Sequence, residues 1–188
     1  MPEASRTKPK IRCHGLWKVF GDAAEAACAR RGNRTSVDEA IAGTDAIIGA
    51  SDVNLEITPG ELFVIMGLSG SGKSTVLRCI AQLQRPSAGE VWLDDANLAN
   101  MPEAQLMDIR RHRMGMVFQN FGLVPHFTAL QNIAFPLKVR GESAEQCAAK
   151  ANEMLDLVGL HGRGGAYPSE LSGGQQQRVG IARSLAVD

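Results

Sequence analysis

The sequence predicts an α/β fold, because three consecutive features have the order strand, loop and helix. A continuous apolar run at Leu62–Met66 has the length and composition of a buried parallel strand. The glycine-rich loop Gly67–Thr75 follows directly and matches the pattern GxxxxGK(S/T). A helix-like stretch over Ser74–Gln84 comes next, with apolar residues on one face and Pro86 closing it. These three elements form the centre of the predicted fold.

Two strands are expected before this centre. Ile11–Phe20 and Ala46–Ile57 both place apolar residues among polar ones, as strands do. The segment between them, Gly21–Gly43, is rich in Ala, Arg, Asp and Glu and lacks a strong apolar stripe. It could hold one short surface helix at Asp22–Arg30.

Two more strands are expected after the centre. Glu90–Leu93 is a short strand-like segment, and the pair Asp94-Asp95 turns the chain, although a glycine would suit the second position of that turn better. Met114–Gln119 is the next apolar segment and is interpreted as a strand.

A helical section is expected over Leu130–Val158. Ser143 and Gln146 have the spacing of a capping box, which predicts a helix start between them. Gly159 is a plausible helix stop. One face of the section is apolar, which predicts that it packs against a core: Cys147, Ala151, Met154, Leu155 and Val158.

Length and composition limit the classes of protein to which the chain can belong. The 188 residues fit one domain, or one domain with a small subdomain, and 44% hydrophobic residues suffice for an ordinary core. The 20 basic and 20 acidic side chains cancel, so no overall field steers the chain to nucleic acid. The four cysteines form no CxxC pair, which argues against a zinc site or disulfide framework and for a reducing cytosol: Cys13, Cys28, Cys79 and Cys147.

The sequence also lacks the apolar segments of a membrane protein. No apolar run approaches the roughly 20 residues that a membrane span needs. Four basic residues near the N-terminus (Arg6, Lys8, Lys10 and Arg12) have no apolar segment behind them, so they do not form a secretory signal. We interpret residues 1–15 as a solvated basic leader, with a membrane-surface contact as the alternative. Any membrane link is therefore expected to come through a partner.

The loop at residues 67–75 carries the clearest chemical signal. Glycines 67, 70 and 72 allow backbone angles that aim successive N–H groups into one concavity, and the following helix adds the positive end of its dipole. Lys73 can reach the β- and γ-phosphates of a nucleotide, and the Ser74 hydroxyl can ligate Mg²⁺. A plain serine-glycine turn is the alternative. The loop therefore predicts binding of a nucleoside triphosphate.

A second motif gives the family. Leu171-Ser172-Gly173-Gly174-Gln175 stands roughly a hundred residues after the loop and opens a Gln- and Arg-rich helix that runs to about Ala186. With these motifs the chain, from near Leu16 onward, resembles the ATP-binding subunit of an ABC transporter. The resemblance implies an α/β P-loop NTPase with a RecA-like core, an N-terminal antiparallel β region, a helical subdomain and an incomplete core sheet. We expect a nucleotide-binding core at residues 16–119 and a helical subdomain with the signature motif at residues 120–188.

The resemblance assigns roles to single residues. Phe20 stands where the family places an aromatic ring that stacks on adenine, with Trp17 as a possible substitute and core packing as the alternative for Phe20. Gln119 looks like the family's Q-loop glutamine, which contacts Mg²⁺ or positions the attacking water; a plain polar strand end is the alternative. Lys73 and Gln119 are the implied catalytic residues, and Ser74 and Gln119 the implied Mg²⁺ ligands. The residues after Gln119 are expected to form an apolar surface near a docked membrane partner: Phe121, Leu123, Val124 and Pro125.

The resemblance also implies ATP and Mg²⁺ as cofactors and a second ATPase subunit as partner. In the family the signature of one subunit closes over the γ-phosphate held by the other, so two chains bind two ATP molecules head to tail. A simple turn is the alternative for the signature. The implied nucleotide-binding residues are Phe20, Gly67, Leu68, Ser69, Gly70, Ser71, Gly72, Lys73, Ser74, Thr75, Ser172, Gly173, Gly174 and Gln175.

Finer features resemble importers of glycine betaine, proline, choline and related osmoprotectants. They are the stretch from Phe63 to Thr75, the segments Pro125–Thr128 and Tyr167–Leu171, and the long connection between the first two strands. Gln175 and Asp95 depart from that branch, which often has methionine and glycine there. The resemblance implies transmembrane permease subunits and, indirectly, a substrate-binding protein as partners, no nucleic acid, and a peripheral location on the cytoplasmic face of the inner membrane.

The family's acidic Mg²⁺ and water-activating residues and its switch histidine have no counterpart before Asp188. We therefore expect a C-terminally truncated chain that exposes an apolar sheet edge, is poorly soluble or only partly folded, and hydrolyses ATP negligibly. One alternative is a non-hydrolysing nucleotide-binding fragment that pairs with an intact subunit. Another is an ABC ATPase without a transporter, acting in DNA repair or translation.

Overall fold

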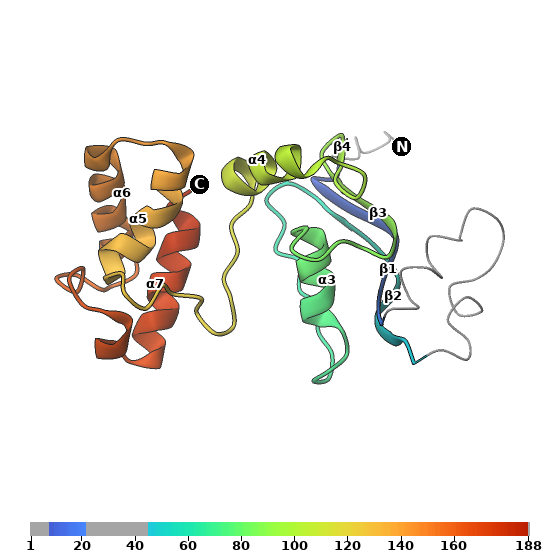
Figure 1. Cartoon of the computed structure of the whole chain (residues 1–188), viewed down its shortest axis with the longest axis horizontal. Helices are drawn as coiled ribbons and strands as arrows, with labels where there is room; N and C mark the ends of the chain where they lie inside the picture. Colours follow the sequence, from blue (N-terminus) through green and yellow to red (C-terminus); the bar gives the residue numbers. More distant parts are fainter. Residues whose placement is uncertain (1–7, 22–44, 188) are drawn as a thin grey trace, which may run out of the picture. The chain divides into compact units, whose positions relative to one another are not determined.

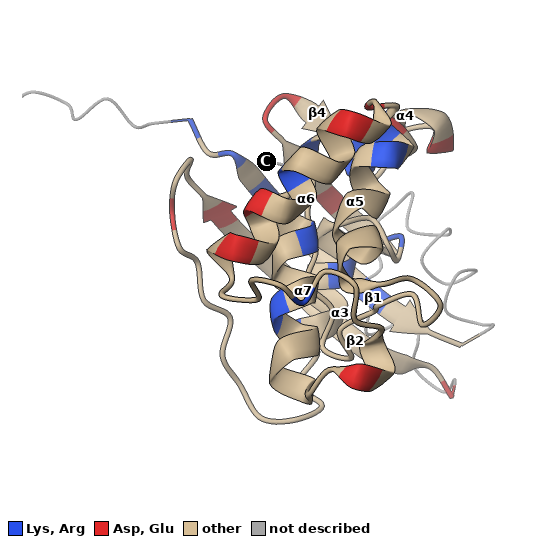
Figure 2. Ribbon diagram, turned by 90° about the vertical axis from the view of Figure 1, so that its left-hand side faces the viewer, with Lys and Arg blue, Asp and Glu red and all other residues tan. Residues whose placement is uncertain are grey.

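The computed structural model describes residues 8–21 and 45–187. It divides into two compact units, Met1–Leu106 and Met107–Asp188, and each is described by itself (Figure 1). The predicted helix at Asp22–Arg30, residues 1–7 of the predicted basic leader and Cys28 lie outside the described residues. Basic residues (blue) and acidic residues (red) are interspersed along the ribbon in Figure 2.

The first unit contains an antiparallel sheet with the order β2-β1-β3-β4. The strands are β1 (Ile11–Phe20), β2 (Ile47–Ile57), β3 (Ala88–Leu93) and β4 (Ala96–Asn97). β1 pairs with β2 on one side and β3 on the other. The predictions of strands at Ile11–Phe20, at Ala46–Ile57 and at Glu90–Leu93 are therefore confirmed, with small shifts of their bounds.

The turn between β3 and β4 uses the predicted aspartate pair. Leu93 pairs with Ala96, so Asp94 and Asp95 form a two-residue connection. Asp94 adopts φ 53°, in the left-handed region that Asp tolerates better than most residues. Its N–H donates to the carbonyl oxygen of Lys10 at 2.8 Å, which ties the turn to the start of β1.

Helix α3 (Lys73–Ile80) packs against β1 and β2. Its buried side chains are Val76, Cys79 and Ile80. The helix was predicted to reach Gln84 but ends earlier. Gln82 has φ 54°, and a residue in the left-handed region cannot continue a right-handed helix.

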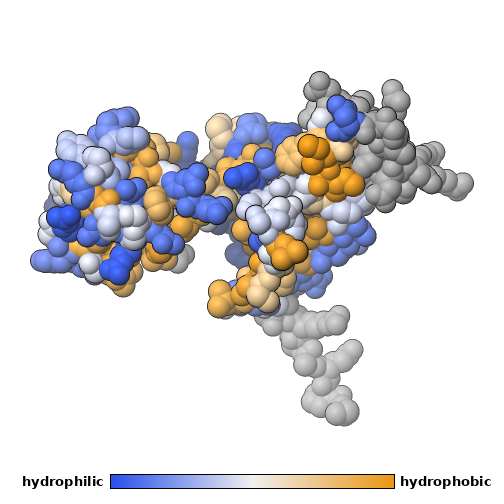
Figure 3. All heavy atoms as spheres, turned by 90° about the horizontal axis from the view of Figure 1, so that it is seen from below, coloured by the Kyte–Doolittle hydropathy of each residue, from blue (hydrophilic) through white to orange (hydrophobic). Residues whose placement is uncertain are grey.

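The prediction of a buried parallel strand at Leu62–Met66 is wrong. Within the described residues this segment pairs with no strand, and Leu62 is 90% exposed and Met66 86%. An apolar run becomes a buried strand only where neighbouring strands pair with it, and the described sheet consists of β1 to β4 alone. Hydrophobic residues, coloured orange, are visible at the surface in the space-filling view of Figure 3. Part of the segment lines, with β2, a cavity of about 410 Å³.

The second unit is helical. α5 (Ala129–Arg140), α6 (Ala144–Leu157) and α7 (Gly173–Leu185) pack on one another, and the short 3-10 helix η1 (Pro168–Glu170) precedes α7. Their shared core is apolar and includes Ala129, Ile133, Leu137, Cys147, Ala151, Met154, Leu155, Val179 and Ala182. In the described parts of the chain, no helix has the length and apolar character to cross a membrane.

The helix ends follow local chemistry. At the start of α6, the Ser143 hydroxyl accepts from the Gln146 N–H and the Gln146 side chain accepts from the Ser143 N–H, so the predicted capping box is confirmed. The start of α5 has the same arrangement at Thr128 and Gln131. Gly159 adopts φ 69° directly after α6, which confirms it as the helix stop.

Two elements differ from expectation near the start of the second unit. Met114–Gln119 is not a strand in the described structure; its residues are partly or fully exposed, and it pairs with none of the described strands. α4 (Glu103–Arg113) was not predicted. Only Leu106 of this helix is buried, so its sequence has no apolar stripe to reveal it.

Candidate nucleotide site

The Lys73 side chain is held inside the glycine-rich loop by backbone carbonyls of the loop. The ammonium nitrogen Nζ donates to the carbonyl oxygens of Gly67 at 2.9 Å and Leu68 at 2.5 Å, and to Oγ of Ser71 at 3.3 Å. The loop therefore curls around a fixed positive charge. A cation enclosed by backbone is a suitable partner for a phosphate, because hydrogen bonds between charged groups are shorter and stronger than neutral ones.

Gly72 ends the loop and starts α3. It adopts φ 86° and ψ 0°, and no side chain caps the helix. The first hydrogen bond of the helix joins the Val76 N–H to the Gly72 carbonyl at 2.9 Å, so the N–H groups just before Val76 face the open end of the helix. A Cβ at Gly72 would lie 2.2 Å from the carbonyl oxygen of Gly49. This cradle of glycine, N–H groups and one lysine fits a phosphate group.

Phe20 lies beside the same loop. A Cβ added to Gly49 on β2 would lie 2.5 Å from Cε2 of Phe20 and 3.1 Å from Cγ2 of Thr75. Nζ of Lys18 lies 5.3 Å from the centroid of the Phe20 ring. Phe20 is partly exposed, whereas Trp17 is 7% exposed and packs in a small cluster with Val19. The structure thus brings the predicted adenine contact next to the predicted phosphate loop.

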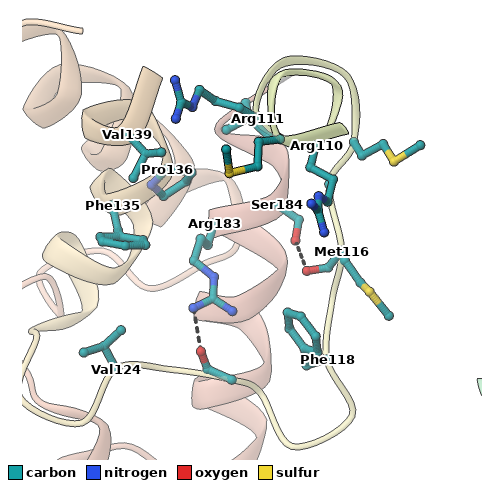
Figure 4. A pocket seen from close by; sticks show the side chains of 15 residues that line it. Arg110, Arg111, Met116, Phe118, Val124, Phe135, Pro136, Val139, Arg183 and Ser184 are labelled. Carbon is teal, nitrogen blue, oxygen red and sulfur yellow. Dashed lines mark hydrogen bonds between the residues drawn. The ribbon is translucent and has the colours of Figure 1, made fainter. Parts of the chain in front are cut away.

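Gln119 lies on an exposed turn whose two flanks are tied to α7. Before the turn, the Ser184 hydroxyl donates to the carbonyl oxygen of Met116 at 2.9 Å. After it, Arg183 donates from Nη1 to the carbonyl oxygen of Gly122 at 2.7 Å and from Nη2 to that of Phe121 at 3.1 Å. Figure 4 shows Ser184 and Arg183 reaching the segment from neighbouring positions of the helix. Sequence reasoning did not identify either anchor.

The turn itself is strained. Phe121 adopts φ 57°, a conformation uncommon for a bulky residue. Its carbonyl oxygen lies 3.3 Å from where a Cβ of Gly180 would stand, so α7 approaches closely because position 180 has no side chain. Burial lowers the pKa of the Arg183 guanidinium, which donates its hydrogen bonds here to backbone carbonyls.

The residues of the LSGGQ motif form the start of α7. The Ser172 hydroxyl accepts from the Gln175 N–H at 3.4 Å, and the Gln175 side chain accepts from the Ser172 N–H at 2.9 Å. Gly173 and Gly174 are exposed in the first turn, so no side chain covers the backbone there. Gln176, which sequence reasoning missed, donates to the carbonyl oxygens of Pro168 and Leu171, both at 3.0 Å, and fixes the preceding loop.

Asn132 is a second residue that sequence reasoning missed. It is fully buried, and its Oδ1 accepts from the Val124 N–H at 2.8 Å. Its Nδ2 lies within hydrogen-bond distance of the carbonyl oxygens of Val124, Phe127 and Thr128. One side chain thus shapes the loop after Gln119. The available signal was a lone amide among apolar residues of the predicted helical section.

A cavity of about 520 Å³ lies within the second unit (Figure 4). Its wall is largely apolar and includes Phe118, Val124, Phe135, Pro136 and Val139, and Arg183 and two arginines of α4 also line it. Of the residues predicted to form an apolar docking surface, Val124 lines this cavity, while Leu123 packs against the helical core.

The predicted site residues therefore form two groups. Phe20 and the loop from Gly67 to Thr75 are together in the first unit, and Gln119 and the LSGGQ residues are together in the second. Ser74 and Gln119, the predicted Mg²⁺ ligands, are both exposed and belong to different units. Hydroxyl and amide oxygens are ligands that Mg²⁺ accepts, so the donor chemistry fits the ion.

Comparison with known proteins gives a family. Residues 50–188 match the family model described as ABC transporter. The ATP-binding protein TmoW of a trimethylamine N-oxide transport system in Pelagibacter ubique is 46% identical over 180 residues, covering 96% of this chain and 52% of TmoW. The glycine betaine/proline betaine transport ATP-binding protein ProV of Escherichia coli is 42% identical over 179 residues, covering 95% and 45% respectively.

A solved structure agrees with these relatives. The dimeric, post-hydrolysis state of the ATP-binding cassette MJ0796 bound to ADP and Pi has a TM-score of 0.79 to this structure at 36% identity. The match covers 94% of this chain and 69% of that one. The chain spans about half the length of the curated relatives it matches. Family model, relatives and fold agree that the chain belongs to the ABC transporter ATPases, a family of P-loop NTPases.

Proposed function

We propose that this chain is the nucleotide-binding part of an ABC importer for methylated-amine osmolytes such as glycine betaine, proline betaine or choline. The observation that carries the proposal is the position of Lys73, whose ammonium lies within the loop on the Gly67 and Leu68 carbonyls. The relatives named for transport of glycine betaine and trimethylamine N-oxide support the class of solute. ATP is the proposed nucleotide.

The chain's own residues would divide the work of binding. Lys73 and the free N–H groups at the start of α3 would hold the phosphates, and Phe20 would contact the base. The Ser74 hydroxyl would be a ligand to Mg²⁺, which when bound neutralises phosphate charge. On binding, Lys73 would exchange neutral carbonyl acceptors for charged phosphate oxygens, which strengthens its hydrogen bonds.

A second ATPase subunit is part of the proposal. The exposed backbone at Gly173 and Gly174, placed on the N-terminus of α7 by the Ser172 cap, suits the γ-phosphate of a nucleotide held by another copy. Permease subunits would bind on the cytoplasmic face of the membrane, and a substrate-binding protein would select the solute. ATP binding and hydrolysis in the assembled transporter would drive uptake.

Solute uptake in the source cell tests this function. Replacing the codon for Lys73 to give Lys73→Ala should strongly reduce uptake of radiolabelled glycine betaine or trimethylamine N-oxide under osmotic stress. Lys150→Ala is the matched control, because Lys150 is on α6 and pairs with Glu153 at the surface. Normal uptake of these solutes in the Lys73→Ala cells would contradict the proposal.

A further inference from the structure

Gly49 lies where β2 meets both halves of the proposed nucleotide site. It is the third residue of β2, next to Ile48, which pairs with Val19 of β1. Gly49 is not among the described glycines with left-handed backbone angles, so its conformation is open to any residue. A glycine within a strand often marks the close approach of another group. The presence of glycine at position 49 must therefore be explained by the space around it and not by its backbone conformation.

That space is filled by the Phe20 ring and the first turn of α3. A Cβ at position 49 would lie 2.5 Å from Cε2 and 3.2 Å from Cδ2 of Phe20. It would also lie 3.1 Å from Cγ2 of Thr75, which belongs to α3. Carbon atoms in contact stay near 3.5–4.0 Å, so even a methyl group would displace the ring.

The backbone of Gly49 contacts the phosphate loop itself. Its carbonyl oxygen stands 2.2 Å from the place where a Cβ of Gly72 would be. One residue therefore touches the aromatic ring through its bare Cα and the end of the loop through its carbonyl. The distance between Phe20 and the loop depends on both contacts.

We infer that Gly49 is a positioning residue that sets the Phe20 ring at the distance from the phosphate loop that a nucleoside triphosphate requires. This inference rests on the proposed nucleotide binding. Gly49 acts through Phe20. It therefore affects the part of the nucleotide affinity that comes from the base, and the part that comes from the phosphates stays unchanged. Lys18, whose ammonium lies over the Phe20 ring, keeps the ring near this position from β1.

The test compares two probes on the full 188-residue chain. Calorimetric titration with MgATP measures base and phosphates together, and titration with magnesium tripolyphosphate measures the phosphates alone. Gly49→Ala should weaken MgATP binding about three- to tenfold, the range of one aromatic contact, and change tripolyphosphate binding less than about twofold. Phe20→Ala should show the same pattern. Ser51→Ala, an exposed change on the same strand, should leave both affinities as they are.

The double variant Phe20→Ala/Gly49→Ala decides whether the two residues act together. It should bind MgATP as weakly as Phe20→Ala and no more weakly, because the ring that Gly49 positions is gone. Should Gly49→Ala fail to fold, the double variant should fold, since it removes the severe 2.5 Å clash with the ring and leaves only the milder 3.1 Å contact with Cγ2 of Thr75. A double variant that also fails to fold would contradict the inference.

Other outcomes would overturn the inference in separable ways. Unchanged MgATP affinity in Gly49→Ala would show that the ring position does not matter. Equal losses for MgATP and tripolyphosphate would place the effect in the loop, and additive losses in the double variant would make the residues independent. Wild-type protein that binds neither probe would overturn the proposed function first, and the inference with it.

Discussion

The hydroxyl of Ser184 donates a hydrogen bond to the carbonyl oxygen of Met116 at 2.9 Å. The next residue back, Arg183, holds two carbonyls on the other side of Gln119. The same helix begins at the Ser172 cap of the LSGGQ motif. One continuous helix therefore fixes both the segment that carries Gln119 and the motif proposed to meet a second nucleotide.

Arg183→Met should destabilise the protein by about 2 kcal/mol, because it removes two hydrogen bonds and leaves two carbonyls without their donor. Urea unfolding measures this change. Arg178→Met is the control on the same helix, since the hydrogen bond that the described part of the chain gives Arg178 is a long one, 3.4 Å to the carbonyl oxygen of Val158. This variant should change stability by less than about 0.5 kcal/mol. Equal effects of the two variants would show that the Arg183 contacts are not specific anchors.

Asn132→Ala should cost about 3 kcal/mol, because the buried amide is the partner of several backbone groups between Val124 and Thr128. Amide hydrogen exchange should also speed up at Val124, whose N–H loses its acceptor. Asn152→Ala removes the same amide from an exposed position with one bond to Ala148, and should be nearly neutral. A neutral Asn132→Ala would contradict the role given to Asn132.

Ser172→Ala and Ser143→Ala remove equivalent caps from α7 and α6 and should each cost about 1 kcal/mol of stability. Only Ser172→Ala should weaken nucleotide-dependent pairing of two copies, because only its helix start carries the LSGGQ motif. Analytical ultracentrifugation with MgATP compares the two. Loss of pairing in both variants alike would point to general destabilisation.

Gly72→Ala should destabilise the protein by about 3 kcal/mol or more, because the new Cβ meets the Gly49 carbonyl and the backbone angle is left-handed. Gly60→Ala has a similar angle, φ 76°, but among the described residues no atom beyond its chain neighbours lies within 4 Å of the new Cβ. Strain alone should cost that variant about 1 kcal/mol. Chemical denaturation of both variants separates the effect of the clash from that of the backbone strain. Equal losses of unfolding free energy would show that the loop moves to accommodate the new Cβ.

Stability should fall as the solution becomes alkaline. Burial, with a smaller contribution from the charge of Cys79, raises the pKa of the Cys13 thiol to about 11, and burial also raises the pKa of Cys79. Unfolded thiols titrate near pH 8.5, so above about that pH the unfolded chain releases protons that the folded chain keeps. The stabilising contribution is complete below pH 8.5 and is lost by about pH 11.

The double variant Cys13→Ala/Cys79→Ala should show a shallower decline of the urea midpoint between pH 8.5 and 11 than the wild type. Its absolute stability will differ, so the slopes are compared. Identical slopes would show that the two thiols do not titrate differently on unfolding.

Local signals predicted much of this fold. The strand Ile11–Phe20 has the predicted bounds, and the capping box at Ser143 follows directly from the spacing of two side chains. The glycine-rich loop and the LSGGQ segment also lie at helix starts, as their sequences indicate. The roles given to Phe20 and Gln119 stay predictions.

The predictions that were wrong or missing concern features that depend on contacts between residues far apart in the sequence. The apolar run Leu62–Met66 has strand composition, but composition cannot say whether another strand pairs with it. α4 buries one side chain, which is too few to give its sequence the apolar periodicity of a helix. The anchors Asn132 and Arg183 bond to backbone carbonyls and amides, which every residue has, so no pair of residue types marks them in the sequence.

Binding of MgATP to the purified chain tests the central claim most directly. Isothermal titration should show saturable binding by the wild type, at least about tenfold weaker binding by Lys73→Met, and unchanged binding by Lys150→Met. The loss follows from removing the one cation that the loop encloses with the Gly67 and Leu68 carbonyls. Wild-type and Lys73→Met chains that bind MgATP equally, or that both fail to bind it, would contradict the claim that this loop is a nucleotide site.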